Sequence, residues 1–164
     1  MYKKDDKTYY DWIDYGYDMK QIKDLEFDHV VGIYRGSLTM AVHISNVFDV
    51  SMSIVGFQTR DGEDKGPYWI HNATPLDHSK DVRWSRQYHG KGSTILIVDD
   101  IYDTGHTMHN VIPFVKVARN KPSAYPNLIG YCLFGKANDK NISYANEHDG
   151  SWIVFPWETL NEPV

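Results

Sequence analysis

The residues best equipped for chemistry form one short run in the second half of the chain. Asp99, Asp100 and Asp103 follow the apolar stretch 95–98, and the small polar segment 104–107 comes directly after them. Carboxylates bind sugar hydroxyls or a divalent cation, and consecutive backbone N–H groups at the start of a helix bind a phosphate. A sugar phosphate accompanied by a divalent metal would satisfy both groups. The alternative is that the three acids are solvated turn residues that cap a helix.

Length and composition are those of one ordinary globular domain. With 164 residues, the chain is long enough for its own core, and we expect a single domain over residues 1–164. A net charge of −5 and a pI near 5.8 argue against general binding to nucleic acid or to an anionic membrane. The N-terminus has no apolar signal region, and no run approaches the ~18 apolar residues of a membrane span. These features predict a cytoplasmic protein.

The elements that must position the acids follow from hydrophobic spacing. Short apolar runs predict strands at 30–34, 51–57, 95–100, 128–134 and 151–157. Apolar residues at helical spacing predict helices at 9–22, at 38–47 and from Met108 onward. The alternation implies β-α-β crossovers and therefore an α/β fold, a mainly parallel central sheet flanked by helices. In such folds, ligands bind beyond the carboxyl ends of the strands.

Two segments are exceptions to this regular alternation. Pro113 lies in the third predicted helix, so that helix either bends or begins its regular part near Asn110. Residues 1–8 are polar, and we expect them to fray.

A long excursion, residues 58–92, interrupts the pattern. It is rich in Gly, Pro, Asp and His, and it carries scattered positive charge. Tyr68 and Trp69 favour some local order, for example a hairpin. Excursions of this length are either plain surface loops or functional segments such as an active-site lid, and both interpretations stay open.

Two further side chains follow predicted strands and could reach the same site. Arg35 comes after the strand at 30–34, and Lys136 comes after the strand at 128–134. Trp152 begins the last predicted strand. Taken alone, Lys136 is more simply a solvated lysine, and Trp152 is more often a core or interface residue than a stacking platform.

The central run carries a family resemblance. VDDIYDTGHT (98–107) resembles the phosphoribosyl pyrophosphate (PRPP) signature of type I phosphoribosyltransferases: a strand, two acids, two apolar or aromatic residues, then D-T-G-x-T. VVGIYRGSL (30–38) resembles the strand and Arg-Gly turn that holds pyrophosphate, often with a cis peptide. LFGKAND (133–139) and SWIVFPWE (151–158) resemble the base-binding segments of the bacterial xanthine-guanine type. The resemblance covers residues 28–57 and 93–158, with a base-binding part at about 134–158.

On the sugar-phosphate side, the resemblance implies three groups of contacts. The 5′-phosphate would be bound by the loop residues Thr104, Gly105, His106 and Thr107. The ribose hydroxyls would be held by Asp99 and Asp100, and Asp100 would also be the partner of Mg²⁺ or of its water shell. Pyrophosphate would be held by Arg35, Gly36 and Ser37.

On the base side, the resemblance implies that Asp103 accepts or donates the proton of the purine ring. Lys136 would donate to the exocyclic oxygen of a 6-oxopurine, Trp152 would stack on the ring, and Ile153 would offer backbone contacts. An ammonium only donates, so it suits an oxygen at that position and opposes the amino group of adenine.

Two positions depart from the family pattern. Ser37 and His106 each stand where the family commonly has a second glycine, in the pyrophosphate turn and in the phosphate loop. We expect phosphate binding to survive, because the His106 side chain could add an N–H or a positive charge. The alternative is that His106 signals a different ligand.

The resemblance as a whole implies an enzyme of purine salvage. It would transfer 5-phosphoribosyl from PRPP to guanine, xanthine or hypoxanthine with release of pyrophosphate, use Mg²⁺, and form a homodimer or homotetramer. A second hypothesis is a regulator of the same fold that binds PRPP or a nucleotide without turnover. A third, a phospho-accepting receiver domain, is disfavoured because receivers place their acid pair near the N-terminus and lack a D-T-G-x-T loop.

Overall fold

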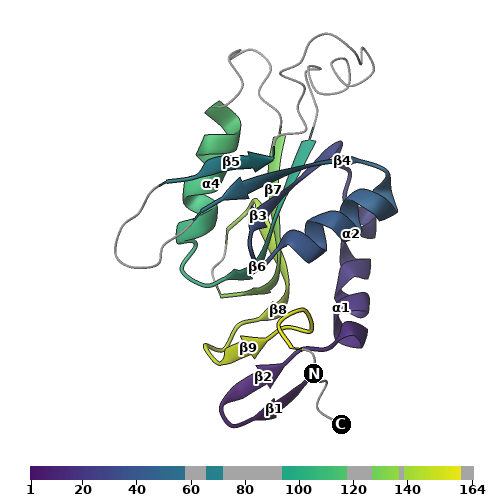
Figure 1. The fold of residues 1–164 in the computed structure, drawn as a ribbon, viewed down its shortest axis with the longest axis vertical. Helices are drawn as coiled ribbons and strands as arrows, with labels where there is room; N and C mark the ends of the chain where they lie inside the picture. The colour runs from purple at the N-terminus through teal and green to yellow at the C-terminus, as the bar shows by residue number, and fades with distance from the viewer. Residues whose placement is uncertain (58–65, 72–93, 118–126, 137–138, 160–164) are drawn as a thin grey trace.

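A six-stranded sheet forms the centre of the computed structural model, which describes residues 1–57, 66–71, 94–117, 127–136 and 139–159 (Figure 1). In spatial order its strands are β5 (Tyr68–His71), β4 (Ser51–Gly56), β3 (His29–Tyr34), β6 (Thr94–Tyr102), β7 (Asn127–Gly135) and β8 (Ile142–Glu147). All neighbouring strands are parallel except β4 and β5. This confirms the predicted α/β fold with a mainly parallel sheet.

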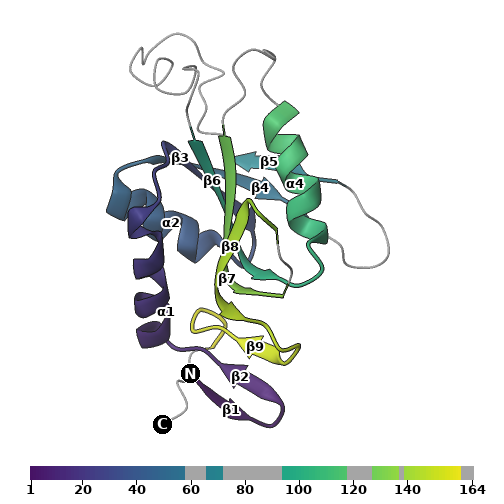
Figure 2. The same cartoon turned by 180° about the vertical axis from the view of Figure 1, so that it is seen from behind.

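Helices cover both faces of this sheet (Figures 1 and 2). One face carries α1 (Trp12–Asp18), the 3₁₀ helix η1 (Met19–Asp24) and α2 (Leu38–Phe48), and the other carries α4 (His106–Val117). The side chains of β6 alternate between the two cores: Leu96 and Val98 pack with α2, whereas Ile95 and Ile97 pack with α4. A strand buried on both faces must be continuously apolar, which is why this run was readable from sequence.

The predicted helices exist with adjusted bounds. The segment 9–22 divides into α1, which starts with a capping box between Asp11 and Asp14, and the 3₁₀ turn that buries Met19 and Ile22. Helix α4 begins at His106 and contains Pro113, so of the two alternatives for this helix the start near Asn110 is excluded.

A second, three-stranded sheet corrects the expectation that residues 1–8 fray. It contains β1 (Tyr2–Lys4), β2 (Lys7–Tyr9) and β9 (Trp152–Val154), and it lies at the end of the molecule where β6 and β7 finish (Figure 1). The hairpin turns at Asp5 and Asp6, whose φ angles of 50° and 59° are left-handed, a conformation that aspartate tolerates better than most residues. Parallel pairing with β9 then anchors the N-terminus.

Of the excursion 58–92, the structure describes only residues 66–71 within that span. These residues include strand β5, which pairs antiparallel with β4, in agreement with the local order expected around Tyr68 and Trp69. The rest of the excursion, and with it the lid interpretation, lies outside the described residues. Among the described residues, no helix is long and apolar enough to cross a membrane.

Close packing of α2 on β3 gives a test of the fold. A Cβ added at Gly32 would lie 2.6 Å from the Cβ of Ala41. We expect Gly32→Ala to lower the free energy of unfolding by about 1–3 kcal/mol, because helix and strand must separate. The matched control is Gly16→Ala in α1, where nothing lies within 4 Å of the added Cβ and alanine should stabilise by ~0.5–1 kcal/mol. Urea unfolding measures both; equal stability of Gly32→Ala and wild type would contradict the packing.

Candidate functional site

Two adjacent carboxylates follow the buried apolar run of β6. Asp99 is 7% exposed, and its carboxylate accepts from the backbone N–H of Asp100 at 3.1 Å, while that of Asp100 accepts from the Ile101 N–H at 2.8 Å. Burial, reinforced by the charge of Asp100, raises the pKa of Asp99 well above its usual value. Burial and the charge of Glu158 raise the pKa of Asp100. No basic side chain among the described residues neutralises the pair.

This unpaired negative charge suits a divalent cation. Mg²⁺ is commonly held by one or two carboxylates, with the remaining oxygens supplied by substrate and water. The described part of the chain contains no cluster of three or more His, Cys, Asp or Glu side chains that could enclose a metal. The donor set at Asp99 and Asp100 is of the type that holds Mg²⁺ together with further oxygen ligands.

The turn after β3 lies directly against the acid pair. A Cβ added at Gly36 would sit 1.7 Å from Oδ2 of Asp100, so only glycine allows this approach. The peptide bond between Tyr34 and Arg35 is cis, and Arg35 is exposed. Because β3 and β6 are parallel neighbours, their carboxyl ends bring the predicted pyrophosphate turn and the predicted ribose acids together.

The assignment of Ser37 to pyrophosphate needs correction for its side chain. Ser37 is fully buried, and its hydroxyl donates to the carbonyl oxygen of Ile33 at 2.7 Å and accepts from the Ile33 N–H at 2.6 Å. The hydroxyl thus closes the turn and faces the backbone, where it cannot also meet a ligand. The Ser37 side chain therefore stabilises the turn.

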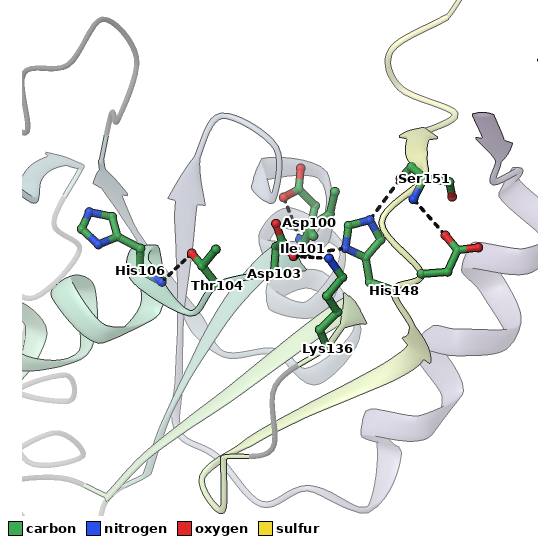
Figure 3. Close-up of polar contacts among 9 residues, drawn as sticks. Asp100, Ile101, Asp103, Thr104, His106, Lys136, His148 and Ser151 are labelled. Carbon is green, nitrogen blue, oxygen red and sulfur yellow. Dashed lines mark hydrogen bonds and ion pairs between the residues drawn. The ribbon is translucent and has the colours of Figure 1, made fainter. Parts of the chain in front are cut away.

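The loop 104–107 has the form expected of an anion cradle at a helix start. Gly105 has a φ of 80°, and an added Cβ would lie 2.9 Å from the Tyr102 hydroxyl. The His106 N–H donates to Oγ1 of Thr104 at 3.3 Å, and α4 begins at that residue. The His106 ring packs 5.6 Å from that of Phe57 and points away from the other site residues (Figure 3).

An ion pair occupies the predicted base side. Nζ of Lys136 donates to Oδ1 of Asp103 at 2.8 Å (Figure 3). The backbone N–H of Lys136 donates to the carbonyl oxygen of Tyr102 at 3.0 Å, so the ends of β6 and β7 are tied together beside the pair. The hydrogen bond from Lys136, and then the charges of Lys136 and His148, hold the pKa of Asp103 below its usual range.

His148 is a site residue that sequence reasoning missed. Its side chain is 9% exposed, and its Nδ1 lies 3.8 Å from Oδ1 of Asp103. Its backbone N–H donates to the carbonyl oxygen of Gly135 at 2.8 Å, which fixes it next to Lys136. No spacing rule marks this residue, because its position depends on a turn between β8 and β9 that joins the end of β7.

The remaining predicted residues lie in β9. Trp152 is 66% exposed, whereas Ile153 is 4% exposed and belongs to the core. Strand β9 pairs with β2 and forms one edge of the small sheet in the described part of the chain. An edge strand leaves one side of its backbone available for a ligand. Base contacts by Trp152 and Ile153 stay predictions.

Replacing Asp99 by asparagine tests the cost of burying the acid pair. Because its pKa is raised in the folded state, the carboxylate destabilises the fold increasingly as the pH rises above the unfolded value of 3.8. We expect Asp99→Asn to gain about 1–3 kcal/mol of unfolding free energy at neutral pH. This gain should disappear below pH 3.8.

Thermal unfolding in EDTA over a range of pH measures this gain. Asp24→Asn, at an exposed acid of η1, is the control and should show no comparable gain. A gain for Asp99→Asn that is the same at every pH, or no gain at all, would show that the carboxylate is not penalised by burial.

Comparisons with known proteins agree with this geometry. Residues 15–162 match the phosphoribosyl transferase domain family. The chain is 26% identical over 133 residues to the xanthine-guanine phosphoribosyltransferase of Cereibacter sphaeroides. The aligned region covers 79% of this chain and 68% of that protein.

Two solved structures show the same fold. A purine phosphoribosyltransferase from Pyrococcus horikoshii has a TM-score of 0.67 and 24% identity, with 97% of this chain and 98% of that chain covered. The Helicobacter pylori xanthine-guanine-hypoxanthine phosphoribosyltransferase has a TM-score of 0.63 and 20% identity, with 93% and 92% covered. The family match spans most of the chain, and the chain belongs to the phosphoribosyltransferase family with its type I fold.

Proposed function

We propose that the protein transfers the 5-phosphoribosyl group from PRPP to a 6-oxopurine and releases pyrophosphate. The observation that carries this proposal is the ion pair between Lys136 and Asp103 at 2.8 Å. A 6-oxopurine presents, on one edge, an oxygen that accepts and a ring N–H that donates. The ammonium and the carboxylate are matched to those two groups, and in the structure they pair with each other.

PRPP would bind along the carboxyl ends of β3 and β6. The loop 104–107 takes the 5′-phosphate, Asp99 and Asp100 accept from the ribose hydroxyls, and the turn at Arg35 and Gly36 holds pyrophosphate. The contact of Gly36 with the Asp100 carboxylate supports this order, because it brings leaving-group and ribose contacts side by side. Asp100 would hold Mg²⁺, which would supply positive charge for the pyrophosphate oxygens.

The residues then act on charges that develop during the transfer. Arg35 stabilises the negative charge that grows on the departing pyrophosphate, and the acid pair favours the positive charge on the ribose. Lys136 holds the exocyclic oxygen, which orients the purine. Asp103 takes the proton that the purine ring loses as the new N–C bond forms.

The names of relatives support a purine substrate. The compared proteins from C. sphaeroides and H. pylori are named for xanthine and guanine, and the second also for hypoxanthine. Trp152, whose ring is exposed at the start of β9, is the proposed stacking surface for the base. Exposed aromatic side chains of α1, Trp12 and Tyr17, support a homodimer or homotetramer.

A panel of bases tests the proposal. With PRPP and Mg²⁺, we expect turnover of at least one of guanine, hypoxanthine and xanthine, and poor turnover of adenine, because Lys136 cannot accept from an amino group. Release of pyrophosphate and formation of the nucleotide are measured by chromatography. PRPP binding without turnover of any base would replace the enzyme by a PRPP- or nucleotide-binding regulator.

Two substitutions separate binding from chemistry. Lys136→Ala should lower kcat/KM for 6-oxopurines about 10- to 100-fold, the value of one charged hydrogen bond. Asp103→Asn should lower kcat by roughly 10²- to 10⁴-fold with little change in PRPP binding. Lys140→Ala, at an exposed lysine nearby, is the control. An unchanged base preference in Lys136→Ala, or equal losses of kcat and PRPP affinity in Asp103→Asn, would remove these residues from their roles.

A further inference from the structure

His148 carries a buried nitrogen without a hydrogen-bond partner. Its Nδ1 is buried and finds no partner among the described residues, although the carboxylate of Asp103 lies 3.8 Å away. Buried polar atoms are almost always paired, so an orphaned one next to a reactive group points to a role in the working site.

The network around the imidazole decides which nitrogen carries the proton. Nε2 lies 3.1 Å from the carbonyl oxygen of Ser151, which can only accept a hydrogen bond. Nε2 must therefore carry the hydrogen, and in the neutral imidazole Nδ1 is left with a lone pair. The Ser151 N–H in turn donates to the Asp149 carboxylate at 2.9 Å, which holds this turn in place. The lone pair of Nδ1 is thus aimed at Asp103 by a rigid frame (Figure 3).

We propose that His148 is the second acceptor of the proton that the purine loses to Asp103. This rests on the proposed function, because it requires a purine that gives up a ring proton at this site. In the structure, Lys136 donates to the Asp103 oxygen that is nearest to His148. A bound 6-oxopurine draws the ammonium to its exocyclic oxygen, and Asp103 is left with the purine on one side and the imidazole on the other.

The proton then has a complete route. The N–H bond of the purine breaks, its electron pair stays in the ring, and an O–H bond forms on Asp103. A ring nitrogen bonds to C1 of the ribose as the bond from C1 to pyrophosphate breaks. Oδ1 of Asp103 lies 3.8 Å from Nδ1 of His148, which is about 1 Å longer than a hydrogen bond. A small side-chain rotation brings the two atoms within hydrogen-bond distance. Transfer to Nδ1 restores the Asp103 carboxylate and leaves an imidazolium whose two N–H groups are both paired.

The relay answers a weakness of Asp103 as a base. A carboxylic acid ordinarily loses its proton well below neutral pH, so Asp103 keeps a proton poorly even after Lys136 has moved to the purine. An imidazole changes charge between about pH 5 and 8, which suits an acceptor at neutral pH. The imidazole also lines a surface cavity together with Lys3 and Ser151. Through this cavity the proton can pass to water.

The charged groups around His148 come from several segments. They are Asp103 before α4, Lys136 after β7, Glu147 and Asp149 beside His148 itself, and Lys3 of β1, which is ion-paired with Asp149. Of these charged groups, Asp103 and Lys136 are the two that change partners when a purine binds.

The decisive experiment is the pH profile of His148→Gln. The glutamine amide can still donate to the Ser151 carbonyl but offers nothing at the position of Nδ1. We expect kcat to fall about 10- to 100-fold, with KM values for PRPP and purine nearly unchanged. Wild-type kcat should drop as the pH falls from about 8 to 5.5, because an imidazolium cannot accept a proton. His148→Gln should lack this drop.

The control is His43→Gln, at a half-buried histidine of α2 that is hydrogen-bonded to the Tyr15 hydroxyl. It should keep the wild-type pH profile. A wild-type profile in His148→Gln, or a loss of activity that is uniform over pH, overturns the relay while leaving the transferase function intact. No turnover of any purine by the wild-type protein overturns both.

A spectroscopic measurement covers the case in which His148→Gln does not fold. Nitrogen-15 NMR of wild-type protein with labelled histidine identifies the tautomer of each ring. At pH 8 we expect the neutral form of His148 to carry its hydrogen on Nε2, with a bare Nδ1. A hydrogen on Nδ1 instead would leave no acceptor for the Asp103 proton and would overturn the proposal.

Discussion

Burial of β6 on both faces is the constraint on which the rest of the structure depends. The strand is continuously apolar over 95–98, where it lies between α2 and α4, and Asp99 and Asp100 follow this run directly. Burial raises the pKa of both carboxylates there, the charge of Asp100 raises that of Asp99 further, and neither has a basic partner in the described part of the chain. The strand end is therefore unfavourable for the folded protein and favourable for a cation and a polyhydroxylated ligand.

The other site elements are arranged around that strand end. Glycine is the only residue type that fits against Asp100 at position 36. The tight turn at Gly105 leads into α4. Lys136 and His148 reach the site through hydrogen bonds that join the backbones of neighbouring segments. Both converge on a single carboxylate oxygen of Asp103. The base side is consequently arranged around one carboxylate oxygen, to which Lys136 donates and near which Nδ1 of His148 lies.

Sequence could predict what depends on local pattern. The strands of the large sheet, except β5 and β8, and the D-T-G-x-T loop followed from continuous apolar runs and residue spacing. Strand β8 was missed because Ile142 is its one buried residue, and β2 because its partner is β9, at the other end of the chain. The inward turn of Ser37 and the approach of His148 to Asp103 depend on tertiary contacts, for which no local signal exists.

The central claim is that a 6-oxopurine replaces the mutual contact of Lys136 and Asp103. A crystal structure of the protein with guanosine monophosphate tests this most directly. We predict that Nζ of Lys136 moves from Asp103 to the exocyclic oxygen of the base, with the 5′-phosphate in the loop 104–107. A nucleotide bound elsewhere, or a base in the site with Lys136 still paired to Asp103, would contradict the account.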